Sequence, residues 1–158
     1  MRVSVIIPAW NLQELTAACL RSLAAHSAGA DLDVLVVDNG STDATPTDLP
    51  PLGRSLFGPR FRMLRLPDNL GFARACNAGA AAAHGDLLFF LNNDTLCTPG
   101  WLPPLLEAFT DSRVGAAGPR LLYPDGRIQH CGIAFSPFFR VGHLYEPFPG
   151  AHPAPARP

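Results

Sequence analysis

The sequence contains no lysine, so all 12 of its Lys and Arg positions are arginine, and its formal net charge is −1. It therefore lacks the excess of positive charge that binds nucleic acid or an anionic membrane surface. No apolar stretch approaches the ~20 residues that a transmembrane helix needs. The apolar run Val3–Ile7 is too short for a signal peptide and stops at Pro8. We expect a soluble, cytoplasmic domain with no membrane span and no nucleic-acid partner.

Two common phosphate-binding loops are also missing. No G-x-G-x-x-G follows the first apolar run, and a G-x-x-x-x-G-K-[ST] loop requires lysine. The four cysteines, Cys19, Cys76, Cys97 and Cys131, include no C-x-x-C pair, which argues against a zinc site or a small disulfide scaffold. We expect free thiols in a reducing compartment.

The 158 residues do contain short apolar runs that alternate with helical patterns. Buried strands are predicted at 3–8, 33–38 and 87–91, and an alternating, more exposed strand near a sheet edge at 61–66. Because parallel strands need crossover helices between them, the order of elements predicts an α/β fold with a mainly parallel sheet.

The helical patterns fall between these strands. A helix is predicted from Leu12 to His26, with Asn11 and Glu14 as a capping box. Another is predicted from 69–72 to 83 with Gly85 as its stop, and a third follows Pro99. Residues 46–60 hold four prolines and are predicted to form a loop with at most a short helix.

Past residue 110 the patterns weaken. We predict strands at 114–122 and 128–135 with a turn at 124–126 between them. The last eight residues, 151–158, contain three prolines and no periodicity, which is typical of a disordered tail.

Polar residues follow three of the predicted strands. They are residues 8–11, 38–43 and 92–94. Because open α/β sheets bind ligands at the carboxyl ends of their strands, we expect these groups to meet in one crevice. Asn92, Asn93 and Asp94 offer hard oxygen ligands for a divalent ion bridged to phosphates, and Asp38 could accept hydrogen bonds from a base or sugar. The alternative is that Asp38 and Asp43 merely form turns or cap helices and that Asp94 is a plain turn residue.

Several blocks together resemble the family 2 glycosyltransferases, inverting enzymes of GT-A fold that use nucleotide-sugar donors. The matching blocks are residues 5–8, 36–43, 69–79, 85–86 and 91–95. Residues 118–126 and 128–132 are similar to the subgroup with rhamnosyl- and related transferases of bacterial surface polysaccharides. The resemblance implies a three-layer α/β domain. It also implies transfer of a hexose or deoxyhexose, with inversion, to a saccharide or lipid-linked acceptor.

The resemblance also implies roles for individual residues. Donor binding falls to Pro8, Ala9, Asn11, Asp38, Asn39, Ser41, Asp43, Arg74, Asn92 and Asn93. Residues 92–94 stand in place of the family's D-x-D motif, with Asn92 replacing its first aspartate. Asp94 and Asn92 would hold Mg²⁺ or Mn²⁺, which would neutralise the departing nucleoside diphosphate. Trp10 is interpreted as a pocket wall or a core aromatic, and His130 and His143 as structural residues or late ligands of metal or diphosphate.

One part of the family pattern is missing. Inversion requires a general base, which in this family is an acid in the second half of the domain. Asp125 and Glu146 are the only acids after Asp111, and neither lies in a matching motif. We therefore interpret 1–122 as the nucleotide-sugar-binding core, 123–150 as the start of the acceptor side and 151–158 as a tail, in a chain cut before its base.

Two other functions, a homodimer and a membrane location remain open. The chain could be a nucleotide-sugar-binding fragment without catalysis. A nucleotidyltransferase of similar layout would need a basic, glycine-rich loop after the first strand, and residues 8–11 offer none. An apolar face exposed by truncation would favour a homodimer. The acceptor could bring the protein to the inner face of the membrane.

Overall fold

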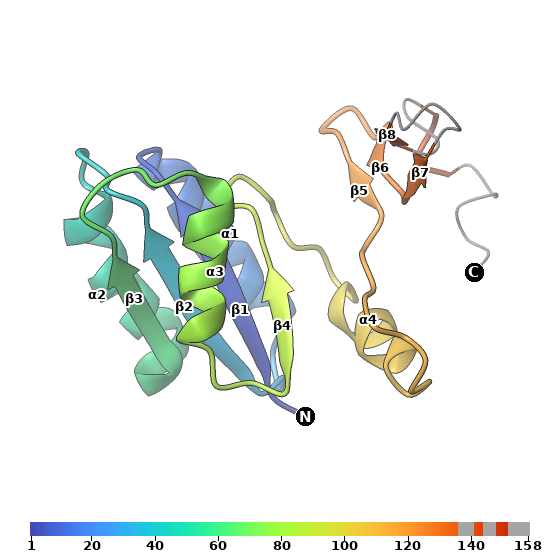
Figure 1. The fold of residues 1–158 in the computed structure, drawn as a ribbon, viewed down its shortest axis with the longest axis horizontal. Helices are drawn as coiled ribbons and strands as arrows, with labels where there is room; N and C mark the ends of the chain where they lie inside the picture. The colour runs from blue at the N-terminus through green and yellow to red at the C-terminus, as the bar shows by residue number, and fades with distance from the viewer. Residues whose placement is uncertain (136–140, 144–147, 152–158) are drawn as a thin grey trace. The chain divides into compact units, whose positions relative to one another are not determined.

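The computed structural model describes residues 1–135, 141–143 and 148–151 (Figure 1). The chain divides into two compact units, Met1–Pro99 and Gly100–Pro158, which we call the first and second units. The functional division at residue 122 stays a prediction. The predicted tail lies outside the described residues except for Ala151.

A four-stranded parallel sheet in the order β3-β2-β1-β4 forms the centre of the first unit. Its strands are β1 (Val3–Ala9), β2 (Leu32–Asp38), β3 (Phe61–Arg65) and β4 (Leu87–Phe90). Every residue of β1 and β2 is buried, because each has a strand on both sides and helices above and below. The predicted parallel sheet is confirmed, as is the edge position of β3.

Helices cover both faces of this sheet. Helices α1 (Gln13–His26) and α2 (Thr45–Phe57) pack together behind it in Figure 1, and α3 (Phe72–Ala81) lies in front of β1 and β2. Gly79 allows α3 to approach closely, because a Cβ atom there would lie 2.4 Å from Ile6 Cγ2. The result is the predicted three-layer α/β arrangement.

Strand β4 differs from its prediction as a central strand buried on both faces. It forms an edge of the four-stranded sheet, and Leu88 and Phe90 are 47% and 46% exposed. Side chains two residues apart share a face of a strand, so one face of β4 presents both apolar groups. The unbroken apolar run therefore predicted that a strand forms here, but it could not show whether that strand is paired on one side or on both.

Helix α2 replaces the predicted proline-rich loop. Pro46 lies in the first turn, where a missing N–H has no consequence, but Pro50 and Pro51 lie inside the helix. Leu49 is fully buried, and Gly53 fits against the ring of Phe61 so tightly that a Cβ atom would overlap it. Packing of this helix face on β3 outweighs the poor intrinsic propensity.

The predicted capping box at the start of α1 does not form. Asn11 and Leu12 adopt left-handed φ angles of 55° and 56°, and no side chain of the helix's own N-cap residue caps it. Instead, Asp43 Oδ2 accepts a hydrogen bond from the backbone N–H of Gln13 at 3.1 Å. The cap comes from the loop after β2, so the local sequence around residue 11 could not reveal it.

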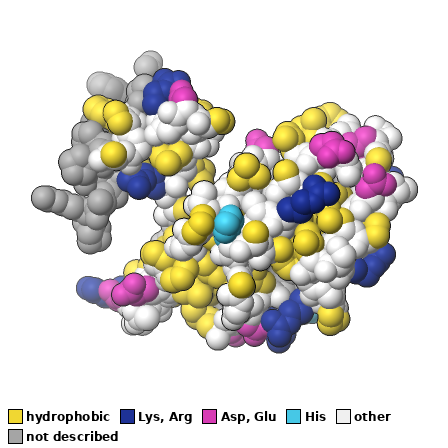
Figure 2. All heavy atoms as spheres, turned by 180° about the vertical axis from the view of Figure 1, so that it is seen from behind, with side chains coloured by type: hydrophobic (Ala, Val, Ile, Leu, Met, Phe, Trp, Pro, Cys, Tyr) yellow, Lys and Arg dark blue, Asp and Glu magenta, His cyan; other side chains and the backbone are white. Residues whose placement is uncertain are grey.

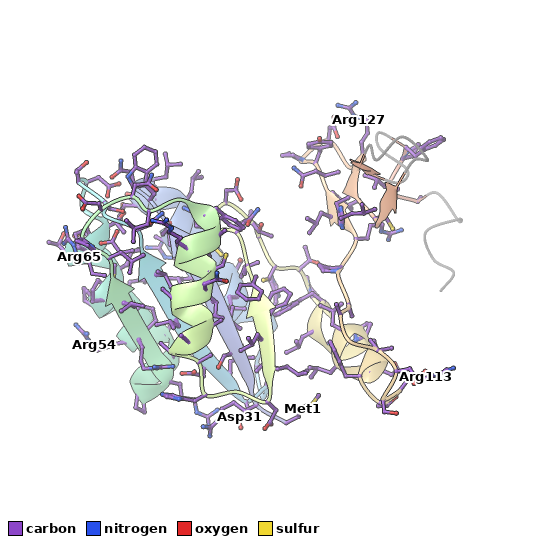
Figure 3. The ribbon with its side chains drawn as sticks, viewed as in Figure 1. Met1, Asp31, Arg54, Arg65, Arg113 and Arg127 are labelled. Carbon is purple, nitrogen blue, oxygen red and sulfur yellow. The ribbon has the colours of Figure 1, made fainter. Side chains whose placement is uncertain are left out.

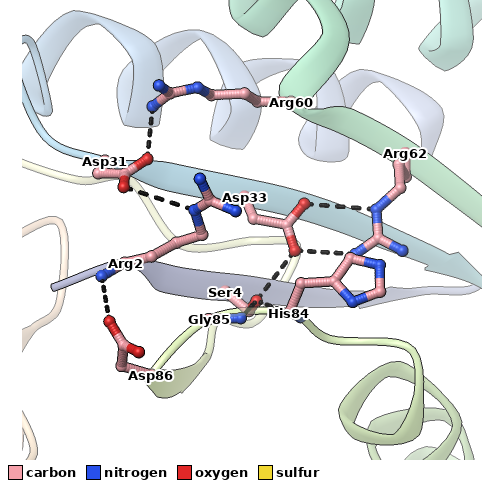
Figure 4. A network of polar contacts seen from close by, with 9 residues as sticks. All are labelled: Arg2, Ser4, Asp31, Asp33, Arg60, Arg62, His84, Gly85 and Asp86. Atoms are coloured by element: carbon pink, nitrogen blue, oxygen red, sulfur yellow. Dashed lines mark hydrogen bonds and ion pairs between the residues drawn. The ribbon is translucent and has the colours of Figure 1, made fainter.

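A buried polar network joins the strands at the end of the sheet where they begin (Figure 4). Arg62 on β3 contacts Asp33 on β2, and Asp33 accepts a hydrogen bond from Ser4 on β1. Gly85 was predicted to stop α3, but α3 ends at Ala81. Gly85 instead lies against Ser4 in this network. A glycine is required there, because a Cβ atom would lie 2.5 Å from the backbone nitrogen of Ser4.

The second unit contains short elements. Gly126 N donates to Tyr123 O at 2.9 Å, which confirms the predicted turn. The predicted strand at 114–122 is limited to its last two residues, and the one at 128–135 is interrupted at residues 131–132. The elements are α4 (Leu102–Ala108), β5 (Leu121–Leu122), β6 (Ile128–His130), β7 (Ile133–Phe135) and β8 (Val141–His143).

The charged side chains are scattered among apolar ones on the face that Figure 2 shows. Some basic groups pair with nearby acids, such as Arg113 with Asp111 at 2.7 Å and Arg127 with Asp125 at 2.8 Å. Charge is thus neutralised locally in these places. In the described part of the chain, none of the helices has the length and apolar character that crossing a bilayer requires.

Candidate functional site

A pocket of about 270 Å³ opens at the carboxyl ends of the parallel strands. Its lining comes from the ends of β1, β2 and β4 or the residues just after them, from the segment between β3 and α3, and from the first residue of α3: Pro8, Ala9, Trp10, Asn39, Asn69, Phe72 and Asn93. The chain runs from β1 outward to β3 and then crosses back to β4 on the other side of β1. The pocket therefore lies at the topological switch point, where α/β sheets bind ligands.

Four of the predicted donor-binding residues line this pocket: Pro8, Ala9, Asn39 and Asn93. Trp10, which we interpreted as a pocket wall, is 53% exposed there. Asn69 and Phe72 received no individual role from the sequence, although they lie in one of the matching blocks. Phe72 is 62% exposed, so two aromatic faces are available to a ligand with a flat ring.

Asp38 is fully buried and does not line the pocket. Its Oδ1 accepts a hydrogen bond from the backbone N–H of Ser41 at 2.9 Å and closes the turn after β2. Its Oδ2 has no hydrogen-bond partner among the described residues, although Arg65 Nε lies 3.5 Å away. Arg65 is the last residue of β3, at the end of the sheet where the pocket opens. Asp31 lies at the opposite end of the sheet (Figure 3). The ion pair with Arg65 therefore compensates the charge of this buried carboxylate, and no hydrogen bond from the described residues does so at Oδ2.

Asn11, Ser41 and Asp43 tie the end of β1 to the loop after β2. The N–H of Asn11 donates to Ser41 Oγ at 2.7 Å, and Asn11 Oδ1 accepts from the N–H of Thr42 at 2.8 Å. Burial acts to raise the pKa of Asp43, but hydrogen bonds from the side chain and backbone of Thr45, and then from the backbone N–H of Gln13, outweigh burial and hold that pKa below its ordinary value of 3.8. These predicted residues support the walls of the pocket and are absent from its lining.

A second brace joins Asn39 to the loop before α3. Asn39 Nδ2 donates to Asn69 Oδ1 at 2.8 Å, and Asn39 Oδ1 accepts from the N–H of Leu70 at 2.9 Å. Gly40 makes the approach of the two loops possible: its φ is 78°, and a Cβ atom would lie 2.5 Å from the carbonyl carbon of Asp68. The side chain of Asn39 is therefore held firmly in the pocket wall.

The residues of the D-x-D-like segment follow β4. Asn92 and Asp94 are exposed, and Asn93 between them is half-buried. No three His, Cys, Asp or Glu side chains gather to hold a metal anywhere in the described residues. A single carboxylate such as Asp94 nevertheless fits Mg²⁺ or Mn²⁺ when the ligand's phosphates and water complete the coordination.

The remaining candidates lie elsewhere. Arg74 is exposed on α3, outside the pocket lining, and forms no hydrogen bond or ion pair with another described residue. His130 belongs to the second unit, and the side chain of His143 is outside the described residues. Cys19, Cys76 and Cys97 are free thiols, as predicted. Burial raises the pKa of Cys19 to about 12 and that of Cys97 to about 11, so both thiols are protonated at neutral pH.

Comparison with known proteins identifies the class. Residues 4–141 match glycosyl transferase family 2. The chain is 33% identical over 157 residues to the O-antigen biosynthesis protein RfbC of Myxococcus xanthus, covering 93% of this chain and 12% of that protein. It is 36% identical over 117 residues to an N-acetylglucosaminyltransferase of Mesorhizobium japonicum, covering 73% of this chain and 27% of that protein.

Solved structures show the same fold. The mannosyltransferase PcManGT of Pyrobaculum calidifontis, solved with GDP-Man and Mn²⁺, is similar with a TM-score of 0.70 and 26% identity. The match covers 78% of this chain and 36% of that one. The TarS protein of S. aureus, solved with UDP, is similar in fold with a TM-score of 0.62.

The chain therefore belongs to glycosyl transferase family 2, and its fold is of the GT-A type. The resemblance seen in the sequence is confirmed for the family and the fold. The chain spans 16% and 12% of the lengths of the first two curated relatives that it matches.

Proposed function

We propose that this chain binds the nucleoside-diphosphate sugar donor of a glycosyltransferase. That enzyme would transfer a hexose or deoxyhexose, such as rhamnose, with inversion to a saccharide or lipid-linked acceptor. The observation that carries the proposal is the pocket at the switch point of a family 2 chain. The similar mannosyltransferase solved with GDP-Man supports a donor of this class.

The pocket suits a nucleoside in two respects. Trp10 and Phe72 expose aromatic faces on which a base can stack, as bases do on aromatic side chains in other proteins. The second is the wall formed by Asn39; Asp38, which is buried and outside the pocket lining, would act on the base indirectly by closing the turn that carries Asn39. Asn11, Ser41 and Asp43 would act indirectly, by holding these walls.

The diphosphate would lie toward residues 92–94. In this proposal Asp94 holds Mg²⁺ or Mn²⁺ with Asn92 as a neutral neighbour, and the ion supplies positive charge to the departing nucleoside diphosphate. Arg74 has an exposed guanidinium that pairs with no other described residue and could also approach the phosphates. The homodimer, through the exposed Leu88 and Phe90, and a place at the inner face of the membrane belong to the same proposal.

Calorimetric titration of the chain with UDP, dTDP and GDP, each with Mn²⁺ and with a chelator, tests donor binding. Asp94→Ala should weaken binding of the recognised nucleotide about tenfold or more in Mn²⁺ and leave binding in chelator unchanged. Asp48→Ala, which removes an exposed carboxylate from α2, is the matched control. A chain that melts cooperatively yet binds none of the three nucleotides would contradict the proposal.

A second candidate function is donor binding without transfer, and the state of Asp125 favours it. The N–H of Arg127 donates to Asp125 Oδ1 at 3.0 Å and its Nε donates to Oδ2 at 2.8 Å. These bonds from Arg127, the backbone N–H first, lower the pKa of Asp125, which makes it a poor general base. Glu146 lies outside the described residues. Release of nucleoside diphosphate from a bound donor by this chain would exclude the second candidate.

A further inference from the structure

Helix α1 contacts the D-x-D-like segment and the residues after it at three places. The contacts join side chains three positions apart on the helix to separate points of that segment: Thr16 to Asn93, Cys19 to Asn92 and Ser22 to Cys97. Residues spaced by three are neighbours on a helix surface, so one stripe of α1 makes all three contacts. The segment that carries Asp94 is therefore held from its first residue to Cys97.

The contact of Thr16 involves a side chain that lines the pocket. Thr16 is fully buried, and its Oγ1 accepts a hydrogen bond from Asn93 Nδ2 at 3.0 Å. The single hydroxyl hydrogen of Thr16 is directed to the carbonyl oxygen of Leu12 at 3.4 Å. With its hydrogen turned toward Leu12, the Thr16 oxygen acts as the acceptor for the NH₂ group of Asn93, and the carbonyl Oδ1 of Asn93 is left for the pocket.

We propose that Thr16 is a positioning residue of the donor site. It fixes the amide of Asn93 so that Oδ1 is presented to the ligand as an acceptor, next to Asp94 in the chain. This inference rests on the proposed function. An amide oxygen accepts a hydrogen bond from a hydroxyl group and repels a phosphate oxygen. The group recognised by Asn93 would thus be a hydroxyl of the ribose or of the transferred sugar.

Fixing this amide before the ligand arrives should raise affinity, because binding then has less side-chain freedom to restrict. Thr16 does not line the pocket, so its loss should act only through Asn93 and the neighbouring Asp94. Thr16→Val removes the hydroxyl and keeps the branched shape of the side chain, whereas Thr16→Ser keeps the hydroxyl.

Thr45→Val is a matched control. Thr45 is also fully buried, but it lies on α2, where its polar neighbour is Asp43, and it forms no hydrogen bond with Asn93 or Thr16. Any general effect of replacing a buried threonine by valine should be seen in this variant too.

The first measurement is the NMR signal of the Asn93 side-chain NH₂ group in the ligand-free chain, identified by its absence in Asn93→Ala. Thr16→Val should shift this signal, and Thr16→Ser and Thr45→Val should leave it near its wild-type position. The second measurement is the affinity for UDP, dTDP or GDP, whichever binds, in Mn²⁺. Thr16→Val should weaken it about three- to tenfold, the usual effect of one hydrogen bond, and Thr16→Ser should restore it.

The two measurements separate the possible failures. An Asn93 signal that Thr16→Val leaves in place overturns the positioning role, as does a shifted signal with unchanged nucleotide affinity. Equal loss in Thr16→Val and Thr45→Val also overturns it. If the cooperatively melting wild-type chain binds no nucleotide, the proposed function fails and the positioning role fails with it.

Discussion

Ser4 Oγ on β1 donates a hydrogen bond of 2.9 Å to Asp33 Oδ2 on β2, in a buried cluster at the end of the sheet opposite the pocket (Figure 4). The same Ser4 oxygen accepts hydrogen bonds from the N–H groups of His84 and Gly85 at 3.1 and 2.8 Å. Arg62 on β3 binds both oxygens of Asp33, at 3.3 and 2.8 Å. One hydroxyl group thus joins two strands to the turn that precedes β4.

Removing this hydroxyl should destabilise the first unit. Ser4→Ala leaves two N–H groups without an acceptor and removes one of the donors to Asp33, which keeps those from Arg62. The loss should cost about 1–3 kcal/mol in the free energy of unfolding. Urea unfolding measures the effect, and Ser55→Ala on the exposed side of α2 is the control. Nucleotide affinity at the opposite end of the sheet should stay unchanged. A loss as small as that of the control would show that the bonds of Ser4 contribute nothing net.

The same cluster predicts a dependence of stability on acid. Burial acts to raise the pKa of Asp33, but hydrogen bonds from Arg62 and Ser4 outweigh it and lower that pKa below its ordinary value of 3.8. Protonation of Asp33 is therefore easier in the unfolded chain. Its contribution to stability is present above the ordinary pKa and is lost as the pH falls through the lower, folded value.

Thermal melting as a function of pH tests this sign. The stability gap between the wild type and Asp33→Asn should be widest near neutral pH and should narrow below about pH 4. Asp48→Asn, at an exposed position, should follow the wild-type curve throughout. A gap that stays constant down to pH 2.5 would show that Asp33 titrates alike in the folded and unfolded chain.

The two aromatic side chains of the pocket should contribute to binding without contributing to stability. Trp10→Ala and Phe72→Ala should each weaken nucleotide affinity by about 1–3 kcal/mol if a base stacks on them, with or without Mn²⁺. Because both side chains are more than half exposed, the free energy of unfolding should change little in either variant. Leu12→Ala, a 60% exposed position outside the pocket lining, is the control for a general surface effect. Unchanged affinity in both aromatic variants would place the base elsewhere.

The sequence was sufficient for features that depend on neighbouring residues. The apolar runs at 3–8 and 33–38 predicted β1 and β2, because strands with a partner on each side need apolar side chains on both faces. The sequence was insufficient where contacts with a segment distant in the chain determine the local structure. Helix α2 forms despite its prolines because Leu49 is buried and Gly53 packs on Phe61 of β3, and Asp43 caps α1 from another loop.

The candidate site shows the same division. Strand ends could be placed from the sequence, so Pro8, Ala9, Asn39 and Asn93 were predicted near the pocket that they line. The sequence could not show whether a polar side chain at a strand end turns into the pocket or braces its walls, as Asn11 does. That choice depends on the register between β1 and the loop after β2, which is set by packing of the whole sheet.

Gly40 offers a test of how closely the loops behind the pocket must approach. Gly40→Ala forces a side chain into a residue with φ of 78° and places a Cβ atom against Asp68, 2.5 Å from its carbonyl carbon. Gly29→Ala is a matched control, because Gly29 has a φ of 81° but nothing within 4 Å of the added atom. The left-handed backbone alone should cost about 1–2 kcal/mol in either variant.

Gly40→Ala should therefore be destabilised more than Gly29→Ala, and the excess measures the contact with Asp68. Because the contact would displace the loop that Asn39 hydrogen-bonds, Gly40→Ala should also weaken nucleotide binding, whereas Gly29→Ala should not. Equal stabilities and equal affinities in the two variants would mean that the loops can separate freely. In that case the brace between Asn39 and Asn69 would not be what shapes the pocket.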